Sequence, residues 1–109
     1  MSGGERTGGD DRGGGESATA ERSCLLTYEL GLHVRAASMF VRKALRFRSI
    51  VTVQSGAGSA DGKSVMELLS LAAAHGSTLR IMAEGPDAQD AAGELAELVE
   101  HGFELEDPS

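Results

Sequence analysis

Apolar residues follow two different spacings along the chain. Short runs rich in β-compatible residues predict strands in three segments, CLLTYEL (24–30), SIVTVQS (49–55) and STLRIMAEG (77–85). Apolar residues that recur every three or four positions predict helices in three further segments, 34–47, 65–75 and 87–103. The glycine-rich stretch between the second strand and the second helix leaves room for a short strand at 57–60.

The resulting order, βαββαβα, predicts an α+β fold in which three helices cover one face of a sheet of about four strands. Such a two-layer sandwich buries the apolar stripe of each helix against the sheet. In the last helix the stripe consists of Ala88, Ala92, Leu95 and Val99. In the second helix we expect Leu68 and Ala72 to face the core.

Residues 1–22 differ in composition from the rest of the chain. They hold seven of the 15 glycines, and their only apolar side chains are Met1, Ala18 and Ala20. Such a segment cannot offset the entropy that is lost on ordering, so we expect a disordered, acidic, glycine-rich tail. The folded domain is then expected to span 23–106.

Composition excludes several classes of protein. The single cysteine, Cys24, rules out an internal disulfide framework and a cysteine-based zinc cluster. No apolar run approaches the roughly 20 residues that span a bilayer, and no apolar signal-peptide stretch is present, so the expected location is the cytoplasm. A net charge of −7 argues against nucleic acid as the main partner. The three histidines lack the spacing of a metal site, so neither a metal nor another cofactor is expected.

Charge is segregated within the expected domain. Five cations and no acid lie between Arg35 and Arg48, whereas nine acids and no cation lie between Glu84 and Asp107. One interpretation is two solvated helix faces. The other is that the basic first helix, which includes Arg42, docks an acidic partner or an anion.

The heptapeptide GLHVRAA, residues 31–37, places a histidine where the first helix is predicted to begin. The unpaired amides and the positive dipole end of a helix N-terminus favour an anion. An unprotonated imidazole nitrogen of His33 is a nucleophile, and Arg35 can hold a phosphoryl oxygen through charge-assisted hydrogen bonds. This combination suits a transient phosphohistidine. On spacing alone, a histidine that caps the helix beside a surface arginine is the simpler interpretation.

The octapeptide AGSADGKS, residues 57–64, has the spacing of a relaxed phosphate-binding loop between a strand and a helix. The domain is short for a nucleotide-binding fold, and no apolar strand that ends in aspartate follows to hold magnesium. SVME (64–67) is also a capping-box sequence, which gives Ser64 a structural role. We therefore interpret this segment as the start of a helix.

Three segments, GLHVRAA, DGKSVMELLSL and HGSTLRIMAEGPDAQDA, stand in the order and at the spacing of the HPr family. From Ser23 to Phe103 the chain resembles these histidine-containing phosphocarriers of the phosphoenolpyruvate-dependent phosphotransferase system. The resemblance implies an open-faced β-sandwich with three helices on one side of a four-stranded antiparallel sheet. It also implies a monomeric carrier protein that is not itself an enzyme.

The resemblance implies a role for individual residues. His33 resembles the residue that enzyme I phosphorylates on Nδ1 before the phosphoryl group passes to an enzyme IIA, and Arg35 resembles the residue that steadies this group. Ser64 resembles a regulatory serine that a kinase/phosphorylase modifies in some bacteria. The patch that partners cover corresponds to Val65, Met66 and Leu69. With Arg42, these are the expected partner-binding residues.

Two positions depart from the family pattern. Ala36 stands where the family almost always has proline, and Leu30 replaces a polar residue that is common in sugar-transport members. A leucine before the glycine is more similar to the nitrogen-related regulatory branch. The alternative function is therefore a non-transport regulatory module that acts by docking partners.

Overall fold

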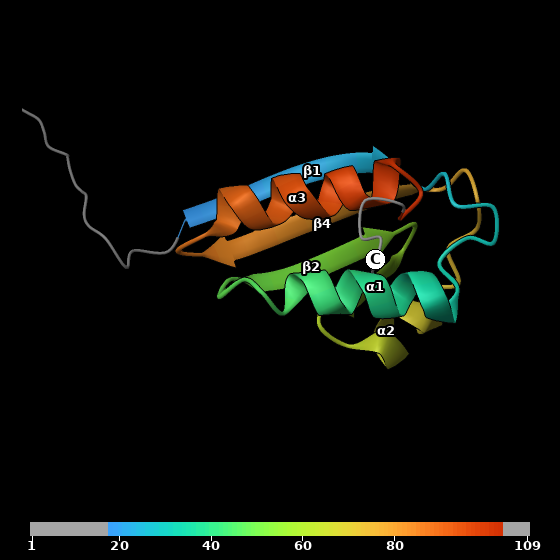
Figure 1. Ribbon diagram of the computed structural model, residues 1–109, viewed down its shortest axis with the longest axis horizontal. Helices are drawn as coiled ribbons and strands as arrows, with labels where there is room; N and C mark the ends of the chain where they lie inside the picture. Colours follow the sequence, from blue (N-terminus) through green and yellow to red (C-terminus); the bar gives the residue numbers. More distant parts are fainter. Residues whose placement is uncertain (1–17, 104–109) are drawn as a thin grey trace, which may run out of the picture.

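The computed structural model describes residues 18–103 (Figure 1). The elements are β1 (Ala18–Leu25), α1 (Val34–Ala44), β2 (Ile50–Ser55), β3 (Gly58–Asp61), α2 (Val65–Ser70), β4 (Thr78–Gly85) and α3 (Ala88–Glu100). This is the βαββαβα order that the spacing of apolar residues predicts, including the short third strand.

The four strands form one antiparallel sheet in the order β1-β4-β2-β3. β4 pairs with β1 along its whole length, from Ala18 opposite Gly85 to Leu25 opposite Thr78, and with β2 on its other side. α3 packs against β1 and β4, and α1 lies beside both α2 and α3 (Figure 1). The α+β fold with one helical layer on an antiparallel sheet is therefore confirmed.

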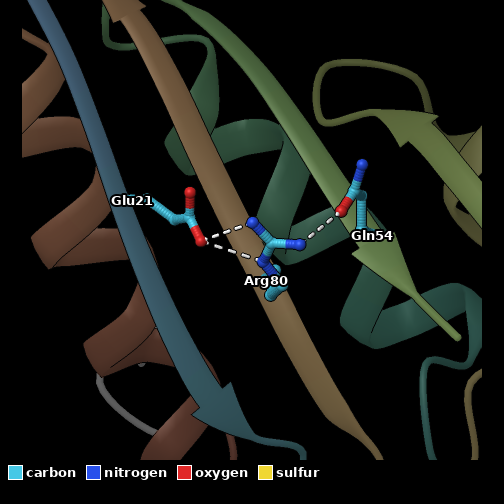
Figure 2. A network of polar contacts seen from close by, with 3 residues as sticks. All are labelled: Glu21, Gln54 and Arg80. Atoms are coloured by element: carbon cyan, nitrogen blue, oxygen red, sulfur yellow. Dashed lines mark hydrogen bonds and ion pairs between the residues drawn. The ribbon is translucent and has the colours of Figure 1, made fainter.

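Side chains of β4 alternate between the two faces of the sheet. Ile81 is fully buried on the helical side, whereas Arg80 is exposed on the other side. There the Arg80 guanidinium donates to the Glu21 carboxylate of β1 at 2.6 and 2.9 Å and to the Gln54 side-chain oxygen of β2 at 3.1 Å (Figure 2). One side chain thus links three strands, although an exposed ion pair contributes at most about 1 kcal/mol.

The core lies between the helices and the sheet. Alanines on the inward sides of α1 and α3 allow the helices to approach closely, and larger apolar side chains fill the remaining space. The largest fully buried side chains include Phe40, Leu68, Ile81, Leu95 and Leu98. The stripe predicted for the last helix, Ala88, Ala92, Leu95 and Val99, is buried throughout.

β1 differs most from the strand that the sequence predicts. It begins at Ala18, inside the segment expected to be a tail, and ends at Leu25. Most of its side chains are exposed, so backbone hydrogen bonds to β4 rather than apolar burial define the strand. Residues 18–22 therefore lie in the sheet. The rest of the expected tail, 1–17, and the end of the expected domain, 104–106, lie outside the described residues.

The first two helices end earlier than the sequence predicts, α1 at Ala44 and α2 at Ser70. After α2 the Ala72 amide donates back to the Leu69 carbonyl at 3.0 Å, which closes a tight turn. Ala72 then takes a left-handed φ of 51°, and its side chain is exposed. The expectation that Ala72 faces the core is wrong because the helix has already ended, whereas Leu68 is buried as expected.

Asp87 fastens the start of α3 to the start of β2. Its carboxylate accepts hydrogen bonds from the Ser49 hydroxyl at 2.6 Å, the Ser49 amide at 3.0 Å and the Arg48 amide at 2.9 Å. These bonds, above all the one from the Ser49 hydroxyl, hold the pKa of Asp87 below its usual value. Ser49 is fully buried, so the protein must supply the hydrogen-bond partner of its hydroxyl.

We expect Asp87→Ala to lower the free energy of unfolding by roughly 1.5–3 kcal/mol at neutral pH, because hydrogen bonds to a charged group are lost. Since the folded-state pKa is lowered, the carboxylate stabilises the fold above its unfolded-state pKa, and this stability is lost as the pH falls through the folded-state value. Urea denaturation at decreasing pH should therefore show the gap between wild type and variant closing in the acid range.

The matched control is Asp90→Ala, which removes an acidic residue from the same first turn and leaves the bonds of Asp87 intact. A gap between wild type and Asp87→Ala that stays constant with pH would contradict this account.

We expect Ala72→Gly to raise the free energy of unfolding by about 1 kcal/mol, because glycine adopts the left-handed backbone without the clash that involves Cβ. The control is Ala74→Gly, which lies in the same loop but does not have a positive φ. Thermal or urea denaturation measures both variants. Equal destabilisation of the two would show that the backbone of Ala72 is not strained.

Candidate functional site

His33 is the N-cap residue of α1, as its place in the sequence predicts. Its backbone is extended, with φ −84° and ψ 170°, and its carbonyl accepts the first helical hydrogen bond from the Ala37 amide at 2.8 Å. Its side chain makes no capping hydrogen bond and is exposed. The simpler interpretation, in which the histidine is used as a helix cap, is therefore wrong for the imidazole.

The loop before His33 is held by backbone contacts. Gly31 has a left-handed φ of 72°, and its amide donates to the Tyr28 carbonyl at 2.9 Å. The Leu32 amide donates to the Ala73 carbonyl at 2.9 Å, and the Leu32 side chain is buried. A Cβ atom on Gly31 would lie 2.6 Å from the same Ala73 oxygen, so this position requires glycine for both space and conformation.

The first turn of α1 forms a candidate anion site beside the imidazole. The amides of Val34, Arg35 and Ala36 have no acceptor within the helix, since the first four amides of any α-helix lack one. No acidic residue lies in this turn, so the positive end of the helix dipole is not offset there. The exposed Arg35 side chain adds a full positive charge. The arrangement suits a doubly charged oxyanion group next to a nucleophilic ring nitrogen.

Arg35 and Arg42 lie on one side of α1, because a separation of seven residues is about two helical turns. Both side chains are exposed. The basic residues of this region therefore extend along α1 away from His33, which fits the interpretation that this helix meets an acidic partner.

α2 carries the predicted partner-binding patch. Met66 has 78% of its side-chain surface exposed, whereas Val65 and Leu69 are half-buried and pack partly against the core. α2 lies beside α1, so the patch and the basic residues belong to the same layer of the molecule. Two of the three apolar residues thus pack partly against the core, and the third, Met66, is the most accessible.

Ser64 is the N-cap residue of α2. Its hydroxyl accepts a hydrogen bond from the Glu67 amide at 3.2 Å, and the Glu67 carboxylate accepts one from the Asp61 amide at 2.8 Å. The Lys63 ammonium donates to the Phe47 carbonyl at 2.8 Å. These structural partners support the interpretation of 57–64 as the start of a helix rather than a nucleotide-binding loop.

The other two histidines lie in different parts of the fold. His75 is exposed in the loop after α2, whose backbone runs beside Gly31, and His101 is the C-cap residue of α3. Among residues 18–103, no group of three or more His, Cys, Asp or Glu side chains could hold a metal ion. Burial raises the pKa of the Cys24 thiol to about 12, so this residue is a neutral, buried side chain. Within the same residues, no helix is long and apolar enough to cross a membrane.

Sequence reasoning missed two exposed apolar residues of α1 and its end. Val34 is 48% exposed and directly follows His33, and Leu45 is 62% exposed at the C-cap of the helix. Both fall outside the buried stripe of α1, which is formed by Ala37, Phe40, Val41 and Ala44. Their positions outside the helical stripe could have shown from the sequence that they are exposed.

Comparison with known proteins identifies relatives of most of the described region. The sequence family described as PTS HPr component phosphorylation site matches residues 20–101. The phosphocarrier protein HPr of Borreliella burgdorferi is 50% identical over 70 residues, covering 64% of this chain and 81% of the relative. That of Vibrio cholerae is 39% identical over 80 residues, covering 73% and 94%.

A crystal structure of the phosphocarrier protein HPr from Bacillus anthracis is similar with a TM-score of 0.72 and 33% sequence identity. The similarity covers 75% of this chain and 98% of that chain, so it includes nearly all of the compared protein. The residues matched by the family contain His33, the first turn of α1 and all of α2. The chain therefore belongs to the HPr family, the phosphocarrier proteins of the phosphotransferase system.

Proposed function

We propose that His33 is the residue that carries the phosphoryl group. The observation that carries this assignment is an exposed imidazole at the N-cap of α1 that makes no capping hydrogen bond. The donor is an enzyme I-type phosphoprotein, and the acceptor is an enzyme IIA-type protein. The chain itself acts as a monomeric carrier and not as a catalyst.

In the accepting step, the lone pair of a neutral imidazole nitrogen attacks phosphorus, and the phosphorus–nitrogen bond of the donor phosphohistidine breaks. Nδ1 is the ring nitrogen closer to the main chain, so a phosphoryl group there lies nearest to the amides of the first helical turn. The proton on the other ring nitrogen can remain in place. The reverse sequence of bond changes delivers the group to the histidine of the acceptor.

Arg35 stabilises the transferring group from the first turn of α1. A guanidinium presents several donors in a plane, which matches the oxygens of a phosphoryl group in transit. Arg42, two turns further along the helix, steers an acidic partner towards the site. Ala36 has an amide that the family proline lacks, but this residue is fully buried, so the exposed amides of Val34 and Arg35 are the ones that can meet the phosphoryl group.

The apolar residues of α2 form the surface on which both partners dock. Met66 is flexible and polarisable, so one side chain can adapt to two different partner surfaces. The half-buried Val65 and Leu69 hold that surface in shape. Phosphorylation of Ser64 by a serine kinase/phosphorylase regulates docking, because a phosphate of charge about −1.5 to −2 would stand at the N-cap of the short helix that carries the docking patch.

A second candidate function is a regulatory module of the nitrogen-related branch that docks partners without serving sugar transport. The observation that favours it is Leu30, whose side chain is 66% exposed three residues before His33. An exposed leucine there favours partners with an apolar surface around the acceptor histidine.

We expect enzyme I and phosphoenolpyruvate to give this protein an acid-labile phosphoryl group that is absent in His33→Ala. The reason is that this substitution removes the nucleophile and leaves the backbone of the N-cap unchanged. Radiolabelling followed by acid treatment measures the outcome. His75→Ala and His101→Ala are the controls and should label as the wild type does. An unlabelled wild type with every enzyme I of the source organism would favour the regulatory module instead.

We expect substitutions of Ser64 to separate folding from docking. Ser64→Ala removes the cap and should lower the free energy of unfolding by about 1 kcal/mol, with transfer kinetics nearly unchanged. Ser64→Asp keeps a capping oxygen but adds charge beside Met66, and it should raise the KM for the partner roughly ten-fold. Denaturation and steady-state transfer assays test the pair. Equal KM values for the two variants would exclude charge at position 64 as a regulator.

A further inference from the structure

We propose that the backbone of Ala72 and Ala73 is a positioning element for His33. This inference rests on the proposed role of His33 as the phosphoryl carrier. The element consists of one left-handed residue, Ala72, and the carbonyl of the next residue, which receives the loop that leads into α1.

Ala72 has an unusual conformation that its own side chain does not explain. A left-handed φ of 51° is disfavoured for alanine, and the exposed methyl group gains no burial in return. Ala72 directly follows the C-cap residue Leu71, a position where a left-handed residue often ends a helix but where glycine is usual. With alanine there, the contacts made by the carbonyl of the next residue can offset the unfavourable conformation. Residues held in such regions persist only where surrounding structure fixes them, and they concentrate at functional sites.

The carbonyl of the next residue, Ala73, contacts the loop before His33. The Ala73 carbonyl accepts the Leu32 amide at 2.9 Å, and it lies only 2.6 Å from where a Cβ atom of Gly31 would stand. Leu32 directly precedes His33, and the His33 amide donates back to the Gly31 carbonyl at 2.8 Å. The Ala73 carbonyl therefore holds the Gly31–Leu32 peptide group, and the carbonyl of that same group accepts the amide of the N-cap residue.

The loop that supplies this carbonyl is itself fixed at its other end. The Gly76 amide donates to the Leu26 carbonyl at 2.8 Å, and the Leu26 amide donates to the Ser77 carbonyl at 2.8 Å. Within the loop, the Ala74 amide donates to the Ser77 hydroxyl at 3.1 Å. The far end of the loop cannot follow a rotation at Ala72, so such a rotation would move the Ala73 carbonyl relative to Leu32.

The same connection joins α2 to His33. α2 ends at Ser70, and its last turn is closed by the bond from the Ala72 amide to the Leu69 carbonyl. A partner that presses on α2 therefore acts on the start of α1 through the short backbone segment from Leu71 to Ala73. Docking and the placement of the imidazole are linked by this route.

The test compares Ala72→Val with Ala72→Gly. A β-branched residue opposes the left-handed conformation, whereas glycine accepts it, so only valine should turn the Ala73 carbonyl away from Leu32. In Ala72→Val we expect hydrogen exchange of the Leu32 amide to accelerate roughly ten-fold or more. The kcat for phosphorylation of His33 should fall roughly ten-fold, with little change in the KM for enzyme I, because the docking patch is untouched. Ala72→Gly should resemble the wild type in all three measurements.

Gly56→Ala is the matched control for a general loss of stability. Gly56 has a φ of 57°, and a Cβ atom there would meet no other atom within 4 Å, so this variant carries similar backbone strain in the β2–β3 turn. It should leave Leu32 exchange and kcat unchanged. If Gly56→Ala slows phosphorylation as much as Ala72→Val, the effect is one of stability and the proposal is wrong.

A second pair of variants keeps the test decisive if Ala72→Val does not fold. Gly31→Ala pushes directly on the Ala73 oxygen, whereas Gly56→Ala places its Cβ in open space at a φ of 57° and lies outside this loop. Only the first should expose the Leu32 amide and slow transfer. A Leu32 amide that remains protected, or one that is exposed without any loss of kcat, overturns the proposal.

The failure of this proposal can be told apart from the failure of the proposed function. If His33 of the wild type accepts no phosphoryl group, the carrier assignment is wrong. Nuclear magnetic resonance shifts of the His33 ring then decide the positioning inference. They should move in Ala72→Val and stay in place in Gly56→Ala, and equal shifts in both variants would reject it.

Discussion

The first turn of α1 is held in place without help from the side chain at its N-cap. Most helix starts use an N-cap side chain to satisfy one of the free amides, but the His33 imidazole makes no such bond. The turn is anchored instead through the main chain, by Leu32 on the Ala73 carbonyl and by the buried Leu32 side chain. The free imidazole and the free amides can then face the same ligand. Through these bonds the start of α1 is attached to the loop after α2, and that loop is attached in turn to Leu26, directly after β1.

The local distribution of charge matters more for recognition than the net charge of the chain. The chain as a whole is acidic, yet Arg35 and Arg42 are exposed on one side of α1, the helix that begins directly after His33. The basic and acidic helices lie next to each other, and Lys43 of α1 forms an ion pair with Glu94 of α3 at 3.6 Å. A partly exposed pair of this kind adds little stability, so the close packing of small residues must hold the two helices together. Arg35 and Arg42 remain exposed for recognition.

The parts of the structure that sequence predicts are those fixed by local pattern or burial. The stripe of α3 that includes Leu95 was predictable because apolar spacing and burial coincide. The place of His33 followed from the helical spacing that begins at Val34, although the strand expected directly before Gly31 ends at Leu25. The start of β1 was not predictable, because its exposed residues are recruited by the hydrogen bonds of β4, which lies far along the chain. The conformation of Ala72 gave no signal either, since glycine is the residue that usually marks such a turn.

α2 is too short to be stable alone, because helices of fewer than about 12 residues are marginal in water. Three features stabilise it: the buried Leu68, the hydrogen bonds that Ser64 and Glu67 accept at its start, and the turn at Ala72 that closes its end. Such a helix can present Met66 to a partner at little cost in core packing. In the proposed function its two ends have different roles: charge placed at Ser64 would change the docking surface, whereas rotation at Ala72 would change the support of His33. Regulation at the first end therefore need not disturb the geometry that the second end maintains.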